Sequence, residues 1–212
     1  MLKFEKNKKN VIIFILIILF IILALIFFVQ FSKNNYKTIN IGNNNLNKTL
    51  EEVEDYILNI NSYKATMEVT INSNKNTNKY ILKQTHNKDE DTQEVIEPEN
   101  IKGVKLTYKD STLKIENTNL NLEKLYNNYP YIENNNLWLN SFIQEYKNSN
   151  NSTIAEQDGK IVLEIKAKYD NKIGYKKLFL DKKTLKPTKL LILDNNQNEI
   201  IYILYNVIEI NY

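Results

Sequence analysis

Short runs in which every second residue is apolar are the feature that most limits how this chain can fold. Residues 64–71 alternate apolar side chains with lysine, threonine and glutamate, and residues 159–167 repeat the pattern. Because successive side chains of a strand point to opposite faces, each run predicts a strand with one buried face. Runs of the same kind cover residues 78–86, 92–97, 103–109, 111–117 and 175–181. Such strands in succession predict an antiparallel meander.

Three segments have apolar residues at helical spacing instead. Residues 46–60 predict a helix, and Thr49 with Glu52 fits a capping box at its start. Two further helical stripes interrupt the strands, over residues 122–129 and 138–146. The order of helix, strands, helices and strands predicts an α+β fold, in which helices cover the concave side of a strongly curved antiparallel sheet.

The last two strand-like runs, residues 187–193 and 199–210, are apolar at almost every position. A strand without a polar face has to be buried on both sides. We therefore expect helices or a partner to cover both faces of the sheet where these strands lie.

The N-terminus predicts the compartment. Residues 11–29 are apolar without interruption and would span roughly 28 Å as a helix, enough for a bilayer core. We expect a basic cytoplasmic tail at 1–10, a transmembrane anchor at 11–29, a polar linker at 30–45 and an extracytoplasmic domain at 46–212. A cleaved signal peptide is the alternative, but no small-residue cleavage site follows the apolar run.

The net charge of +3 belongs entirely to the first ten residues. That segment contains Lys3, Glu5, Lys6, Lys8 and Lys9. The rest of the chain is neutral, so it offers little electrostatic attraction to a phosphate backbone. The charge distribution therefore argues against a nucleic-acid partner.

The reactive side chains argue against catalysis. The chain has no cysteine, which excludes disulfides and thiolate metal sites. His86 is the single histidine and could bind a metal with Asp89 or Asp91, but we expect a solvated histidine in a turn. No nucleophile-elbow or phosphate-loop motif is present. We therefore predict neither an enzyme nor a site for a metal or cofactor.

The C-terminal segment, residues 178–211, resembles the LolA-like superfamily. The matching positions are Leu180, Asp181, Thr184, Leu185, Pro187, Val207, Glu209 and Asn211. Within that superfamily the chain looks most like the clostridial germination lipoprotein GerS and its relatives. GerS proteins are lipoproteins, whereas this chain has no cysteine to acylate; a transmembrane anchor would replace the lipid.

The resemblance implies an unclosed β-barrel of about ten or eleven strands with a helical lid. It also implies a non-catalytic role outside the cytoplasm, which for GerS relatives is support of an amidase that modifies the spore cortex. On that basis we expect the body in the space outside the plasma membrane, which in a sporulating cell includes the space between the forespore membranes. The alternative is a binder or carrier of a hydrophobic ligand, such as a lipid or a lipoprotein acyl chain.

Two sets of candidate site residues follow. Aromatic residues of the expected lid are the candidates for binding a protein partner: Tyr126, Tyr129, Tyr131 and Trp138. Apolar residues of the concave face are the candidates for a ligand cavity: Met67, Val69, Leu106, Leu163 and Ile165. Filling of that concavity by the protein's own side chains is the alternative to a ligand.

Overall fold

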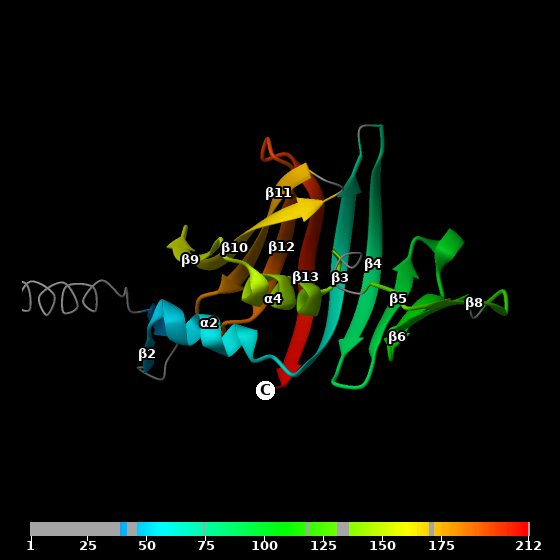
Figure 1. Ribbon diagram of the computed structural model, residues 1–212, viewed down its shortest axis with the longest axis horizontal. Helices are drawn as coiled ribbons and strands as arrows, with labels where there is room; N and C mark the ends of the chain where they lie inside the picture. The colour runs from blue at the N-terminus through cyan, green and yellow to red at the C-terminus, as the bar shows by residue number, and fades with distance from the viewer. Residues whose placement is uncertain are drawn as a thin grey trace, which may run out of the picture. The chain divides into compact units, whose positions relative to one another are not determined.

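Eleven strands form one antiparallel sheet in the described part of the chain (Figure 1). The computed structural model describes residues 39–41, 46–73, 75–117, 119–130, 136–169 and 172–211. The strand order across the sheet is β8-β7-β6-β5-β4-β3-β13-β12-β11-β10-β9. The strands that precede the second helix are β3 (Ser62–Asn72), β4 (Thr77–His86), β5 (Asp91–Glu97), β6 (Val104–Lys109), β7 (Thr112–Asn117) and β8 (Leu122–Asn127). The strands that follow it are β9 (Ser152–Gln157), β10 (Lys160–Tyr169), β11 (Lys172–Asp181), β12 (Pro187–Leu193) and β13 (Glu199–Asn211).

The two outermost strands, β8 and β9, do not pair with each other, so the sheet is unclosed as predicted. The runs of alternating residues all form strands, and their meander order is confirmed from β3 to β7. Strand β9 is an addition, because residues 152–157 were not predicted as a strand.

Helix α2 (Leu50–Leu58) begins at the predicted capping box. The Thr49 hydroxyl accepts the N–H of Glu52 at 3.2 Å, and the Glu52 carboxylate accepts the N–H of Thr49 at 2.7 Å. These bonds satisfy N–H groups that the first turn of a helix leaves free. The residues before Thr49 form a small ladder of β1 (Ile39–Ile41) with β2 (Leu46–Lys48), so the helix begins later than its apolar spacing predicts.

The main core lies between two helices and one face of the sheet, which we call the inner face. Val53 and Ile57 of α2, and Phe142 and Ile143 of α4 (Leu139–Asn148), are at most 1% exposed. They belong to one cluster with inner-face residues of β3–β5 and β10–β13, among them Met67, Leu82, Leu163, Leu190 and Ile203. Burying a side chain of this size contributes roughly 1.5–3 kcal/mol. Both helices therefore pack on the half of the sheet that contains β3 and β9–β13 (Figure 1).

Residues 122–129, predicted as a helix, instead form strand β8 and the turn after it. The Asn117 side chain accepts the N–H groups of Asn119 and Leu120 at 3.0 and 3.1 Å, and Asn121 has φ of 52°. Asn tolerates this left-handed conformation and supplies its own turn hydrogen bonds, so the chain reverses and pairs with β7. The helical prediction was wrong because turn chemistry overrode the spacing of the leucines.

The predicted cover of β12 and β13 comes from two sources. On the inner face, helices α2 and α4 bury Leu190 and Ile203. On the outer face, Leu191 is only 7% exposed and lies opposite Tyr202 of β13 in register. Side chains of the sheet itself therefore cover part of the outer face, where the sequence predicts a helix or a partner.

The turn between β11 and β12 contains the motif that carries the family resemblance. The Asp181 carboxylate accepts the N–H of Lys183 at 3.1 Å and both the N–H and the hydroxyl of Thr184, at 2.7 and 2.8 Å. Burial alone would raise the pKa of Asp181, but the bonds from Thr184 outweigh it and hold this pKa below its usual value. Leu185 has φ of 58° and is 3% exposed, which closes the turn against the core.

The described helices are too short or too polar to cross a membrane. The predicted tail at 1–10, the anchor at 11–29 and most of the linker at 30–45 lie outside the described residues.

Candidate functional site

The half of the inner face formed by β6, β7 and β8 has no described helix above it (Figure 1). The register places apolar side chains in cross-strand rows there, because residues directly opposite each other share a face. We call this surface the open inner face; its residues are Val104, Leu106, Tyr108, Ile115, Leu122 and Tyr126. Leu113 lies among them and is 5% exposed, although it is not part of the main core cluster. The open inner face therefore adjoins the main core at Val104 and extends beyond it.

The outer face of the same three strands is charged. Lys114 forms ion pairs with Glu116 at 2.7 Å and with Glu123 at 2.9 Å, and Lys105 lies 3.8 Å from Glu116. The hydrogen bond from Lys114 lowers the pKa of Glu116, and the same bonds raise the pKa of Lys114. The outer face of β6 and β7 is thus mainly charged, whereas their inner face is mainly apolar and has no described cover.

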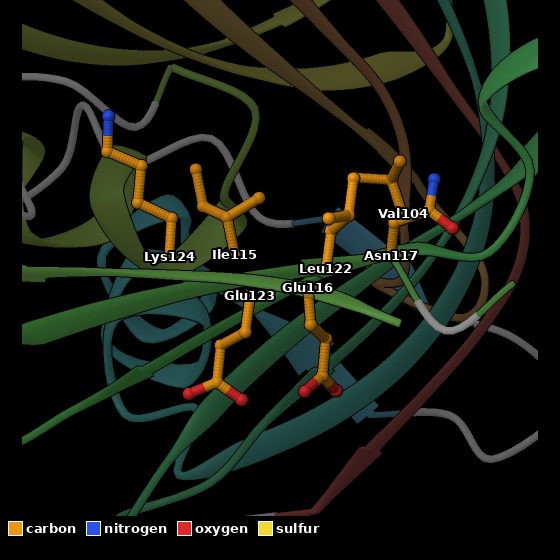
Figure 2. Close-up of a pocket in the computed structure, with 7 residues that line it drawn as sticks. All are labelled: Val104, Ile115, Glu116, Asn117, Leu122, Glu123 and Lys124. Carbon is orange, nitrogen blue, oxygen red and sulfur yellow. The ribbon is translucent and has the colours of Figure 1, made fainter. Parts of the chain in front are cut away.

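A hollow of about 170 Å³ lies at the end of the open inner face. Figure 2 shows Val104, Ile115, Leu122 and Lys124 on one side of the ribbon, and the two glutamates of the lining on the other. A buried cavity of roughly 150 Å³ holds one benzene molecule. The hollow therefore has room for a single apolar side chain and is too small for an acyl chain.

A row of buried polar side chains crosses β3, β4 and β5, next to the strands of the open inner face. The Tyr63 hydroxyl donates to Gln84 Oε1 at 3.2 Å, and Gln84 Nε2 donates to Gln93 Oε1 at 2.7 Å and to the carbonyl of Leu137 at 3.0 Å. Buried amides are costly unless they are bonded, so this row holds β3, β4 and β5 in one register. It also ties the chain just before α4 to the sheet.

His86 lies beside this row. Its side chain is 12% exposed, bonds to Asp91 and lies 5.3 Å from the Tyr63 ring centre. The expected solvated histidine is therefore wrong, because the strand pairing of β4 with β5 places Asp91 directly opposite it. Among the described residues, no group of three acidic or histidine side chains could hold a metal ion.

The four predicted partner-binding residues lie in different surroundings. Tyr126 is on β8, 39% exposed, and contributes to the open inner face. Tyr129 follows β8, is half-buried, and its burial raises its pKa. Trp138 is 3% exposed at the start of α4, and Tyr131 lies outside the described residues. Among the described residues of this set, only Tyr126 is exposed enough to contact a partner.

The five predicted cavity residues are also divided. Met67, Val69, Leu163 and Ile165 are at most 1% exposed and pack in the main core. Leu106 is half-buried on the open inner face. Side chains thus fill the inner face at four of these positions, and ligand binding there stays a prediction.

Val104, Ile115 and Lys124 were not among the predicted site residues. The alternation of residues 103–117 shows that Val104 and Ile115 share a face, whereas Lys124 is in the segment predicted as a helix. Alternation does not show whether a helix covers that face, because the helix comes from a distant part of the chain.

No family model and no curated protein matches the chain. Among solved structures, it is similar to that of the CwlD amidase from Clostridioides difficile in complex with the GerS lipoprotein. The identity is 25%, the match covers 76% of this chain and 92% of that chain, and the TM-score is 0.49. GerS is thus among the proteins that this chain resembles.

Two further structures are similar at lower identity. A LolA superfamily protein from Nitrosomonas europaea is 10% identical, with 78% of this chain and 94% of that chain covered and a TM-score of 0.46. A putative outer membrane lipoprotein-sorting protein domain from Vibrio parahaemolyticus is 10% identical, with 76% and 91% covered and a TM-score of 0.43.

Proposed function

We propose that the chain is a non-catalytic, membrane-anchored binding protein related to GerS, whose extracytoplasmic domain binds a cell-wall amidase. The observation that supports this proposal most is the open inner face. Large apolar side chains are exposed there, with Leu122 at 62% and Tyr126 at 39%. A contiguous exposed apolar surface is typical of a site for a partner.

The chemistry of the open inner face suits a protein partner. Tyr108 and Tyr126 have large rings with polar tips, a combination that is enriched at protein interfaces. The hollow beside Leu122 accepts one side chain, as an anchor pocket does. An acyl chain would need a longer cavity, so these features favour a protein over a lipid.

The identity of the partner is the finer part of the proposal. The C-terminal motif resembles GerS-related proteins, and the GerS structure that the chain is similar to is a complex with an amidase. An amidase that modifies the spore cortex is therefore the first partner to test. A role in sporulation or germination belongs to the same proposal.

The proposed location depends on residues 11–29. An uninterrupted apolar segment after a basic tail would retain the chain in the plasma membrane with its body outside. This arrangement would place the open inner face on the side of the membrane where wall amidases act.

Affinity capture of the full-length chain from sporulating cells tests the proposal. The variant Leu106→Glu places a charge on the open inner face, and Thr107→Glu places it on the outer face of the same strand, as the matched control. We expect the amidase to be captured with the native chain and with Thr107→Glu, and lost with Leu106→Glu. Absence of any amidase at every sporulation stage, or equal capture by all three chains, would contradict the proposal.

A further inference from the structure

We propose that the free edge of β8 is the docking edge for an extended segment of the protein partner. That segment would add to the sheet as a further strand, place an apolar side chain in the hollow and place an acidic side chain beside Lys124. The inference deepens the proposed function, because it states how the partner is recognised.

The position of β8 in the sheet is the first reason. In the described residues it pairs with β7 on one side only and is the last strand of the sheet. Its outward N–H and C=O groups are spaced for hydrogen bonds to another extended backbone. A strand edge of this kind is the template that peptide-binding domains use for strand addition.

The exposure of β8 is the second reason. All residues of Leu122–Asn127 are exposed, and Leu122 and Leu125 are 62% and 56% exposed on opposite faces. Exposed edges normally carry features that prevent pairing, such as charge or a cover. An edge with apolar side chains on both faces offers a partner strand apolar contacts on both of its sides.

The third reason is that the other edge strand, β9, does not expose large apolar side chains as β8 does. Strand β9 has no large apolar residue exposed among its described side chains. Helix α2 packs against it, and Glu156 bonds to Lys182 of the neighbouring hairpin at 2.9 Å. Edge β9 is therefore packed against a helix and has no large exposed apolar residue, whereas edge β8 exposes Leu122, Leu125 and Tyr126 beside its charged residues.

The side chains of β8 determine the chemistry of the added strand. On the inner face, the hollow beside Leu122 accepts one aliphatic side chain. Next to it, the Lys124 ammonium lies 4.9 Å from the Tyr126 ring centre and has no carboxylate bonded to it among the described residues. Glu123, by contrast, is neutralised by Lys114. The partner segment should therefore alternate, with an aliphatic and an acidic residue on its inner side.

Selection of displayed random peptides of about ten residues on the full-length chain tests this edge without a known partner. We expect the selected peptides to alternate and to contain an acidic residue. Leu122→Lys should weaken their binding roughly ten-fold or more. Ala155→Lys, the matched control on β9, should leave binding unchanged. Lys124→Glu should reverse the preference from acidic to basic peptides.

Hydrogen exchange of the full-length chain provides the second measurement. The β8 amides that face away from β7 should exchange quickly in the free protein and slowly with a selected peptide. Three results would each overturn the inference: no selected peptide, binding that is insensitive to Leu122→Lys, or protection in the free protein of the β8 amides that face away from β7. The last result would mean that a second copy or the chain itself covers the edge.

The two proposals can fail separately. If the amidase is captured and Leu122→Lys leaves its capture unchanged, docking at β8 is wrong and the proposed function stands. If selected peptides bind at β8 but no amidase is captured, the docking edge stands and the choice of partner is wrong.

Discussion

The buried ion pair between Lys176 of β11 and Glu145 of α4 holds this helix on the sheet. Its contribution to the free energy of unfolding can be predicted. The Lys176 side chain is 2% exposed and its ammonium donates to the Glu145 carboxylate, which is 19% exposed. Burial lowers the pKa of Lys176, and the attraction of Glu145 opposes that shift. The pair joins α4 to the sheet and so helps to keep this helix away from β5–β8.

Glu145→Gln would remove the carboxylate that accepts a hydrogen bond from the buried ammonium. Removing one partner of a buried pair costs about 3–5 kcal/mol. Because Glu145 is partly exposed, we expect the free energy of unfolding of the variant to be about 2–3 kcal/mol lower than that of the native chain. Replacing both residues, in Lys176→Met with Glu145→Leu, should cost less than about 1 kcal/mol, since no charge remains buried. Glu99→Gln is the control, because it breaks the exposed pair with Lys102 and should cost less than about 0.5 kcal/mol.

Urea unfolding of the full-length chain in a mild non-ionic detergent measures these differences. Trp138 is the single tryptophan and is buried at the start of α4, so its fluorescence reports on this helix. The folded-state pKa of Lys176 is below its unfolded value, so the unfolded chain binds more protons between these two pKa values and stability should rise with pH there. Glu145→Gln should steepen that rise. A cost for Glu145→Gln no larger than for Glu99→Gln would refute the reasoning.

Three further predictions concern the turn, the core and the ligand. Asp181→Ala should lower the free energy of unfolding by about 1 kcal/mol. Because the pKa of Asp181 is depressed in the folded state, native stability should fall as the pH drops through that pKa. Asp181→Asn should remove this pH dependence. Tyr205→Phe should not destabilise the protein and should raise its unfolding midpoint, since the buried Tyr205 hydroxyl has no described partner; a clear loss of stability would show a missing bond. Native mass spectrometry should show no co-purified lipid; an acyl-chain adduct would instead support the carrier hypothesis.

Residue patterns predicted the strands well because alternation reports directly which side chains share a face. The runs 64–71 and 159–167 became β3 and β10, and the capping box at Thr49 formed as its chemistry requires. The same local rules failed at β8. Its leucines are three residues apart, which suits a helix, but they lie on opposite faces of an edge strand where packing does not select a pattern.

The open inner face could not be predicted from the sequence, because it depends on where α2 and α4 pack on the sheet. Two apolar surfaces with the same alternation, on β3 and on β6, differ only in whether a helix from elsewhere in the chain packs on them. In the structure the main core cluster extends to Leu82 of β4 and Val95 of β5, and no local pattern predicts where it stops.

Photo-crosslinking in sporulating cells tests most directly whether the open inner face binds a protein partner. A photoreactive amino acid in place of Ile115 would report on this face, and one in place of Lys114 would report on the outer face of the same strand. The account predicts a crosslink to a cell-wall amidase from position 115 and none from position 114. No protein crosslink from position 115, or equal crosslinks from both positions, would contradict it.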